Sequence, residues 1–275
     1  MTADGEIPDD GFQALLDKIS RDRGFRCASY KTTCLRRRVS VRMRARGLHR
    51  YADYAGLLDR DAGEYDQLLD ALTINVTKLF RNPEVYHAIA REVIPALWDS
   101  PRPRLRVWSA GCASGEEPYS LAALFHRHAE QRRALGQLAR VEIIGTDVDR
   151  RSLEAAERAE FEERDFTETP PEWRARYFAH DAPFTACPEI RRLVRFRQHD
   201  MLREPPPRPV NDLIVCRNAI IYFDRESQER LFDTFFAALS PGGFLVLGKV
   251  ETLFGAARQL FTPVNGRERI FQRPA

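Results

Sequence analysis

The chain has 275 residues, of which 43% are hydrophobic and 30% charged, and its formal net charge is +3 at pH 7. This length allows one large or two modest domains, and the composition is ordinary for a soluble globular protein. No apolar run reaches the roughly 18 residues of a membrane span, and the acidic N-terminus lacks the apolar core of a signal peptide. The five cysteines form no CxxC pair. We therefore expect reduced thiols, no metal site and a cytoplasmic location.

Positive charge is concentrated near the N-terminus. Between positions 18 and 50 the sequence has twelve lysines and arginines and one acid, Asp22, so this segment carries +11. The remainder of the chain is then mildly acidic. A basic segment of this kind is either a solvated helical face or a docking surface for an acidic partner.

The N-terminal part has helical patterns throughout. Apolar residues at 12, 15, 16 and 19 follow the spacing i, i+3, i+4, i+7, which predicts one buried helical face, and Gly24 ends that helix. In a second helix, closed by Gly47, Leu35, Val39 and Met43 share one side. Two more short helices are expected at 51–58 and 65–74. The sequence thus predicts an all-helical domain at 1–80, followed by a linker helix at 81–103.

From about 104 onward, predicted strands and helices alternate. Strands are expected at 104–110, 141–149, 193–201, from 211, and at 244–249; helices are expected at 117–131, 151–161, 169–178 and 225–240. Thr169 and Glu172 bracket two prolines, which predicts a capping box at the start of the third helix. The Pro-Gly-Gly at 241–243 is expected to stop the fourth. Alternation of this kind predicts parallel β-α-β units in a doubly wound α/β sheet, with ligands at the carboxyl ends of the strands.

The stretch "RVWSAGCASGEEPYSLA" connects the first of these strands to its helix. Gly111 and Gly115 permit a tight turn and a close approach of backbone N–H groups to a ligand. The spacing is not GxGxxG and no GKS or GKT follows, so a phosphate-binding loop is disfavoured. Acids at 116 and 117 suit a ligand with an ammonium group; compensation of the helix dipole is the alternative.

The second strand ends in "GTDVD", where folds of this class bind ribose hydroxyls through a carboxylate. Asp147 or Asp149 is suited to this role, and the other is suited to cap the next helix. A glycine turn, an acid for an ammonium group and an acid for a ribose together fit S-adenosylmethionine better than a dinucleotide.

Five motifs occur in the order and spacing of the CheR family, which the chain resembles over nearly its whole length. They are "NVTKLFRNPEVY", "RVWSAGCASGEEPYSLA", "GTDVD", "HDML" and "CRNAIIYF". The resemblance implies an S-adenosylmethionine-dependent glutamate O-methyltransferase of bacterial chemoreceptors, with S-adenosylhomocysteine as a product. It further implies a helical N-terminal domain and a Rossmann-like methyltransferase domain at 104–275, into which a small β-subdomain is inserted at 177–199. We separately expect a monomer.

Site residues follow from the resemblance, position by position. The implied cofactor-binding residues are Asn75, Thr77, Arg81, Gly111, Glu117, Asp147, Asp200, Met201, Arg217 and Asn218. Arg81 and Tyr222 are the implied residues at the reacting groups. The basic helix is expected to dock on the acidic helices of the receptor through Arg36, Arg37, Arg38, Arg42, Arg44 and Arg46. Four of these residues also have a purely structural interpretation when each is considered alone. Asn75 and Thr77 are then helix caps, Tyr222 is a core aromatic residue and Arg217 is a surface residue.

The implied reaction needs little from the enzyme beyond placement. A glutamate carboxylate, with an ordinary pKa of about 4.3, is already ionised at neutral pH and needs no general base. Arg81 is suited to hold it by charge-assisted hydrogen bonds, and Tyr222 to orient an oxygen or the methyl group. The inserted segment contains no glycine and is short, so we expect it not to bind a receptor-tail pentapeptide.

Two other functions are compatible with parts of the sequence. A nucleic-acid methyltransferase is suggested by the basic segment. However, "RNAIIY" stands where such enzymes carry an Asn/Asp-Pro-Pro-aromatic run, and the sequence has no Pro-Cys dipeptide. A non-catalytic S-adenosylmethionine-binding regulator is the second alternative, and the presence of Arg81 and Tyr222 favours an enzyme. We expect no nucleic-acid partner and no direct membrane insertion.

Overall fold

The computed structural model describes residues 11–73 and 77–275, and the contacts within it divide the chain into two compact units. One unit comprises Met1–Ile74 with Tyr222–Ser227, and the other comprises Asn75–Ile221 with Gln228–Ala275. The boundary therefore lies near 75 rather than at 80. Within the described ranges, no helix combines the length and the apolar character that a membrane crossing requires.

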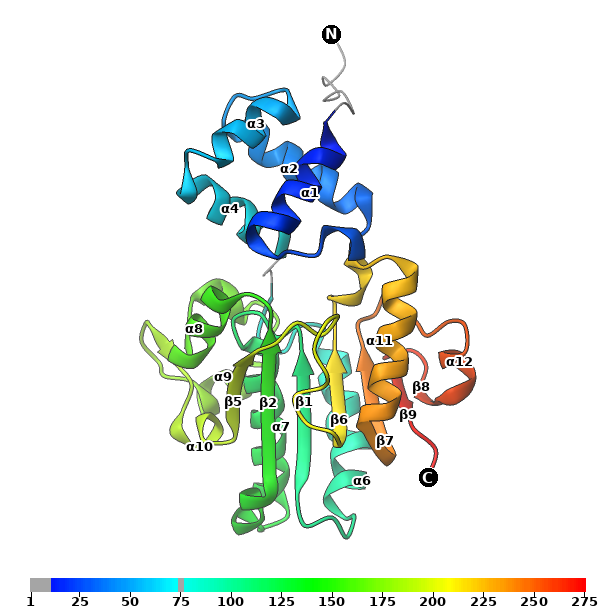
Figure 1. Cartoon of the computed structure of the whole chain (residues 1–275). Coiled ribbons are helices and arrows are strands. Elements are labelled where there is room, and N and C mark those ends of the chain that lie inside the picture. The colour runs from blue at the N-terminus through cyan, green and yellow to red at the C-terminus, as the bar shows by residue number, and fades with distance from the viewer. Residues whose placement is uncertain (1–10, 74–76) are drawn as a thin grey trace. The chain divides into compact units, whose positions relative to one another are not determined.

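The smaller unit is all-helical, as its sequence pattern predicts (Figure 1). Its elements are α1 (Phe12–Arg23), η1 (Cys27–Ser29), α2 (Thr32–Ala45), α3 (Tyr51–Leu58) and α4 (Ala62–Thr73). The apolar positions predicted for the first two helices are the residues that α1 and α2 bury, and they share one core with α3 and α4. Gly24 ends α1 in the left-handed conformation that glycine favours, with φ of 67°.

The larger unit is an α/β domain. Its helices are α5 (Pro83–Ala88), α6 (Ile94–Trp98), α7 (Glu116–Gln131), α8 (Arg150–Arg158), α9 (Pro171–Tyr177), α10 (Pro188–Arg191), α11 (Arg225–Ala238, whose first residues group with the smaller unit) and α12 (Ala257–Leu260). Its strands are β1 (Leu105–Ala110), β2 (Val141–Asp147), β3 (Glu160–Phe161), β4 (Phe184–Thr185), β5 (Val194–Gln198), β6 (Asn211–Cys216), β7 (Leu239–Leu247), β8 (Thr262–Asn265) and β9 (Ile270–Gln272). Short helical turns are η2 (Ile89–Val93), η3 (Leu135–Arg140), η4 (Glu163–Phe166) and η5 (Ile220–Tyr222).

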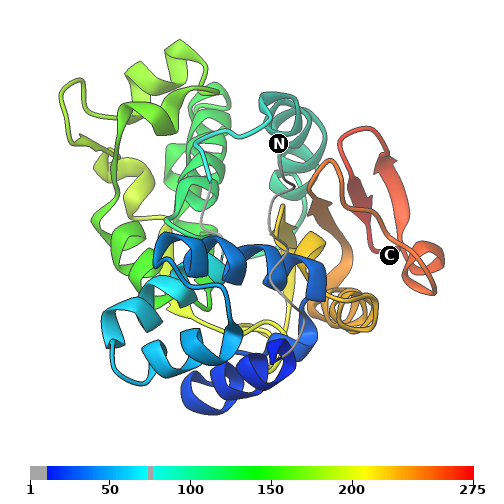
Figure 2. The ribbon, with the colours of Figure 1, turned by 90° about the horizontal axis from the view of Figure 1, so that it is seen from above.

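The central sheet has the strand order β5-β2-β1-β6-β7-β9-β8. The first five of these strands are parallel, and β9 and β8 continue the sheet in antiparallel pairing. In Figures 1 and 2, α7 and the α5–α6 segment cover one face of the sheet and α11 covers the other. The doubly wound prediction is confirmed, and the strand order reverses between β1 and β6, where such folds bind ligands.

The single linker helix expected at 81–103 is not observed. This segment consists of α5, the π-helical turn η2 and α6, and it packs into the core of the larger unit. Val85, Ile89 and Leu97 are fully buried there, so the segment is part of the domain and not a spacer.

The inserted subdomain also differs from the expected range of 177–199. Its two-stranded sheet pairs β4 with β3, which lies before that range, while β5 inside the range belongs to the central sheet. The helix expected at 151–161 ends at Arg158, because Ala159 turns into the left-handed region and β3 follows. β7 begins before the Pro-Gly-Gly and includes it.

The predicted capping box at Thr169 is wrong. The Thr169 hydroxyl donates to the carbonyl oxygen of Leu79 at 3.3 Å, and α9 begins after Pro170 without a side-chain cap. A capping box does occur nearby, at Glu162 and Asp165, where it starts η4. The carbonyl oxygen of Pro170 accepts the first helical hydrogen bonds, from the N–H groups of Trp173 and Arg174. Pro170 is therefore the N-cap residue, and Thr169 lies one residue outside the helix.

Candidate functional site

The turn after β1 requires glycine at position 111. Gly111 has φ of 76°, and its N–H donates to the carbonyl oxygen of Thr146 at 2.8 Å. A Cβ at this position would lie 3.0 Å from Ala219 Cβ and 3.2 Å from Met201 Cε. The backbone at 111 therefore faces residues that follow β6 and β5, and these three segments form one wall at the carboxyl ends of the strands.

Gly115 has a different reason for being glycine. A Cβ there would lie 2.9 Å from Ala156 Cβ and 3.2 Å from the Phe196 ring. Its φ of 95° is also left-handed. This glycine allows the start of α7 to pack closely against α8 and β5, so its role is internal packing.

Both acids at the start of α7 are buried. Glu116 is 3% exposed and accepts hydrogen bonds from the Ser114 hydroxyl, and burial raises its pKa to about 7. Glu117 accepts a hydrogen bond of 2.8 Å from the Ser109 hydroxyl, and Arg217 Nη1 lies 3.7 Å from its other oxygen. Burial also raises the pKa of Glu117, while the Arg217 charge opposes that shift. Dipole compensation alone does not explain two buried carboxyl groups.

The two aspartates after β2 have separate roles. Asp149 caps α8, accepting hydrogen bonds from the Arg151 N–H at 3.0 Å and from the Ser152 hydroxyl at 2.7 Å. Asp147 is 7% exposed and accepts from the N–H groups of Ala113 at 2.8 Å and Asp149 at 3.0 Å. Burial raises the pKa of Asp147. Because Asp149 is the helix cap, Asp147 stays the candidate for the ligand-binding acid.

Arg217 is buried, contrary to its reading as a surface residue. Its Nη2 donates to the carbonyl oxygen of Arg81 at 2.7 Å and to Asn82 Oδ1 at 3.1 Å, and its Nη1 donates to the Tyr86 hydroxyl at 3.3 Å. Since it also lies beside Glu117, it connects the start of α7 with the turn that carries Arg81. This positioning role was not predicted from the sequence.

Unusual backbone conformations cluster around these residues. Four of the seven non-glycine residues with positive φ in the described segments are Phe80, Asn82, Ala113 and Asn218. Positive φ is rare for such residues and persists only where surrounding contacts hold it. The Phe80 N–H is fixed by the Ser120 hydroxyl at 2.9 Å, and the Asn82 N–H by Glu168 at 2.7 Å. The turn bearing Arg81 is therefore held in place from both sides.

Glu251 is the main residue that the sequence reasoning missed. It is 4% exposed, and its carboxylate accepts four backbone N–H groups, from Gly248 at 2.7 Å, Ile220 at 2.9 Å, Asn218 at 3.0 Å and Ile221 at 3.2 Å. It thereby holds the loop after β6 against the end of β7. A lone acid after a strand within "GKVE" gives no local signal for this, because three of its four partners lie about 30 positions earlier.

The residues after β5 are also positioned by the backbone. The His199 N–H donates to the carbonyl oxygen of Asp147 at 2.9 Å. The Asp200 carboxylate accepts from the Leu202 N–H at 2.9 Å, which orders the turn, and Met201 faces Gly111. Thr77 is half-buried, and Asn75 lies outside the described residues.

Tyr222 groups with the helical unit. The Lys31 N–H donates to its carbonyl oxygen at 2.8 Å, and the Arg38 guanidinium lies 5.3 Å from its ring centroid. The structure thus brings together Gly111, Glu117, Asp147, Met201, Arg217 and Asn218 within the larger unit and places Tyr222 in contact with α1–α2 residues.

The five arginines of α2 and Arg46, which caps its C-terminus, are not equivalent. Four of them have partners inside the helical unit. Arg42 makes two hydrogen bonds to Glu64, and Arg46 forms an ion pair with Asp61 at 2.9 Å. Arg38 donates to the Ala71 carbonyl oxygen, and the Arg36 guanidinium lies 4.4 Å from the Phe12 ring centroid. Arg37 and Arg44 are exposed and make no ion pair within the part of the chain that the structure describes. These two side chains are the ones most available to a partner.

The residues of the larger unit fit S-adenosylmethionine. Two buried carboxylates, Glu117 and Asp147, can accept from an ammonium group and from ribose hydroxyls, and Gly111 leaves space beside Met201. The buried Asn218 Oδ1 has no hydrogen-bond partner in the structure and so can accept from a ligand.

Comparisons with known proteins show the family of the chain. Residues 75–270 match the family model for the CheR methyltransferase SAM-binding domain, and residues 10–73 match the CheR methyltransferase all-alpha domain. The chain is 33% identical to a chemotaxis protein methyltransferase of Listeria monocytogenes over 87% of this chain and 88% of that one. It is 32% identical to chemotaxis protein methyltransferase 2 of Pseudomonas aeruginosa over 90% and 88%. The chain therefore belongs to the CheR methyltransferase family and is an S-adenosylmethionine-dependent methyltransferase.

Proposed function

We propose that this enzyme methylates glutamate side chains of a chemoreceptor, giving glutamyl methyl esters for sensory adaptation. One observation carries the proposal: the buried network in which Arg217 joins Glu117 to the turn bearing Arg81. It links the candidate cofactor acid to the arginine that the family resemblance puts at the substrate carboxylate. The names of the relatives support a role in chemotaxis.

In the proposed reaction the cofactor supplies the methyl group and the protein positions the two reactants. Bound S-adenosylmethionine supplies a methyl group on a cationic sulfur. Arg81 holds the substrate carboxylate, which is ionised at neutral pH and needs no base. Holding it in line can contribute up to about 7–11 kcal/mol, provided that Arg81 does not overstabilise the ground state. Glu117 and Asp147 hold the cofactor's polar groups, and Tyr222 orients an oxygen or the methyl group.

We further propose that one face of α2 recognises the receptor. Arg37, Val41 and Arg44 follow the spacing i, i+4, i+7 and so share a side of the helix. Both arginines are exposed, and Val41 is 57% exposed. An apolar side chain between two cations suits an acidic amphipathic helix, and the attraction should weaken with salt. Arg36, Arg38, Arg42 and Arg46, which have partners inside the unit, would then maintain the helix position.

Recognition is proposed to occur without a receptor-tail pentapeptide. Such peptides add a strand to a free sheet edge. In the inserted subdomain β3 and β4 have two residues each, and β4 has neighbours on both sides. It pairs with β3 on one side, while its Thr185 carbonyl oxygen accepts from the Ala179 N–H at 2.9 Å on the other. Little edge is left on β4 for a peptide.

The test is to incubate the full chain with methyl-labelled S-adenosylmethionine and receptor-containing membranes. We expect label on a receptor-sized band that is released as methanol by mild base, as a carboxyl ester requires. Base-stable label, or label on nucleic acid, would contradict the proposal. Charge reversal of Arg37 and Arg44 together should raise the KM for receptor and leave cofactor affinity unchanged. If receptor methylation responds neither to this charge reversal nor to salt, the docking proposal is contradicted. The proposed methylation of glutamate is not affected by that result.

A further inference from the structure

A second pocket lies in the larger unit at the far end of α7 from Glu117. It is formed by side chains from α5 and η2, from the last two turns of α7 and from α9, and has a volume of about 190 Å³. Its polar side chains are His87, Arg91, Arg127, His128, Gln131 and Trp173. Arg127 is ten residues after Glu117 on the same helix, or about 15 Å along its axis, so the pocket is separate from the cofactor site.

The groups around this pocket are hydrogen-bond donors with unused capacity. The Arg127 guanidinium lies 5.3 Å from the Trp173 ring centroid and makes no ion pair or hydrogen bond within the described segments. Trp173 is 3% exposed, and its indole Nε1 has no hydrogen-bond partner there. The buried Nε2 of His128 also has no partner there, and it adds a donor when the ring carries its proton on Nε2. A buried donor without a partner is costly, so these atoms indicate a ligand with acceptor oxygens.

The charge of the pocket points to an anion. Two guanidinium groups line it and carry its positive charge, and no carboxylate lines it. Two imidazoles line it as well, but burial lowers the pKa of His128, which favours its neutral form. Arg91 is partly neutralised by Glu92 at 2.6 Å, whereas Arg127 is not neutralised by any ion pair among the described residues. The His87 ring lies 5.3 Å from the Trp173 ring and is exposed at the pocket mouth. Donors therefore come from three segments around one small space.

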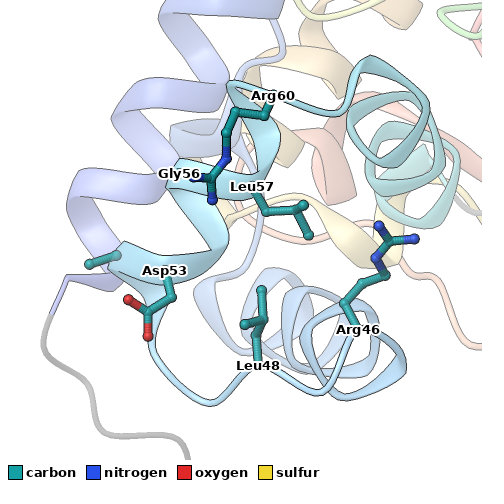
Figure 3. Close-up of a pocket in the computed structure, with 7 residues that line it drawn as sticks. Arg46, Leu48, Asp53, Gly56, Leu57 and Arg60 are labelled. Carbon is teal, nitrogen blue, oxygen red and sulfur yellow. The ribbon is translucent and has the colours of Figure 1, made fainter.

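A pocket on the helical unit provides a contrast (Figure 3). Arg46 and Arg60 line it, but so does Asp53, and Arg46 is already paired with Asp61 at 2.9 Å. Its positive charge is thus compensated locally. It carries no proposal, but its exposed Arg60 offers a matched control for the experiment below.

We propose that the pocket around Trp173 binds the phosphate group of a small phosphorylated molecule. A carboxylate would be satisfied by one guanidinium, whereas a phosphate carries more charge and more acceptor positions, which suits donors from several directions. The volume of about 190 Å³ admits a tetrahedral anion with a small substituent.

The experiment is isothermal titration calorimetry of the full chain with inorganic phosphate, with acetate at equal ionic strength as the comparison. We expect one saturable phosphate site, weaker binding of acetate, and a loss of phosphate affinity of about tenfold or more in Arg127→Gln, as for one lost charge-assisted bond. Arg60→Gln should bind phosphate as the unchanged chain does. S-adenosylhomocysteine affinity should be equal in all three proteins, which confirms that the variants are folded.

Three results would overturn the proposal: no saturable phosphate binding, equal binding of acetate, or unchanged phosphate affinity in Arg127→Gln. If loss of the Arg127 contact with Trp173 unfolds that variant, His87→Gln provides the same test from the exposed side of the pocket, again with weakened phosphate binding expected.

Discussion

Replacing Glu251 with glutamine should damage both stability and cofactor binding. The Glu251 carboxylate accepts two N–H groups on Oε2, from Gly248 and Asn218, and two on Oε1, from Ile220 and Ile221. Glutamine keeps one acceptor oxygen and presents an NH₂ group to the other pair. Two buried N–H groups then lose their partner, whichever way the amide is turned.

The size of the effect follows from these bonds. A hydrogen bond to a charged group contributes about 1.5–3 kcal/mol, so two lost bonds amount to about 3–6 kcal/mol. Burial raises the pKa of Glu251, which shows that the buried charge itself has a desolvation cost that glutamine removes. We therefore expect a net destabilisation of about 2–4 kcal/mol, within a total stability of about 5–15 kcal/mol.

The assay combines urea unfolding with calorimetric titration of S-adenosylhomocysteine. Asp212→Asn is the matched control, because Asp212 is a buried carboxylate at the opposite end of β6 that accepts from the Arg106 N–H at 2.8 Å and the Ser240 hydroxyl at 2.9 Å. Both variants should be less stable, but only Glu251→Gln should lose cofactor affinity. Equal cofactor affinity in the two variants would refute a role of Glu251 in holding the loop at Asn218.

Three further predictions concern the acids and the arginine of the site. Asp147→Ala should weaken S-adenosylhomocysteine binding by about 1.5–3 kcal/mol in calorimetry, because a charge-assisted contact is lost, whereas Asp149→Ala should affect mainly the stability of α8. The pKa of Glu116 is about 7 in the folded protein and near 4.5 in the unfolded chain. Between these pH values the folded state binds more protons than the unfolded state. The free energy of unfolding therefore falls as pH rises from about 4.5 to 7. Glu116→Gln should remove up to about 3 kcal/mol of that fall when urea unfolding at pH 5 and pH 8 is compared; an unchanged pH dependence would contradict the assigned burial effect. Arg81→Ala should abolish methyl transfer in a folded protein, and Arg81→Lys should also be poor because a point charge lacks the guanidinium fork; retention of most activity by Arg81→Ala would show that Arg81 is misplaced.

Much of the fold could be predicted because its signals are local. The apolar spacing in α1 and α2 and the alternation of strands and helices after 104 depend on neighbouring residues only. The errors arose where a distant contact decides the structure. Thr169 is followed by residues typical of a capped helix, yet the helix starts after Pro170, and the Thr169 hydroxyl donates to Leu79, 90 positions away. The two-residue strand β3 lies in a pattern typical of a helix, and only its pairing with β4 makes it a strand.

In the candidate site, too, the residues with local sequence signals could be predicted and those that depend on distant contacts could not. Gly111 and Asp147 follow strands at positions where the fold itself predicts function, and the structure gives each a physical reason. Arg217 and Glu251 could not be assigned their positioning roles from the sequence, because their partners are brought together only when the sheet has formed. The same is true of Arg42 and Arg46, since their partners Glu64 and Asp61 lie in α4 and in the loop between α3 and α4.

The central claim is that this methyltransferase acts on receptor glutamates. The most direct test is tandem mass spectrometry of a purified receptor cytoplasmic fragment after incubation with the enzyme and S-adenosylmethionine. The account predicts a single added methyl group on each of a few glutamate side chains, formed together with S-adenosylhomocysteine, lost after mild base, and absent when Arg81→Ala replaces the enzyme. Methylation of lysine, arginine or cysteine instead, or the same glutamate methylation with Arg81→Ala, would contradict it.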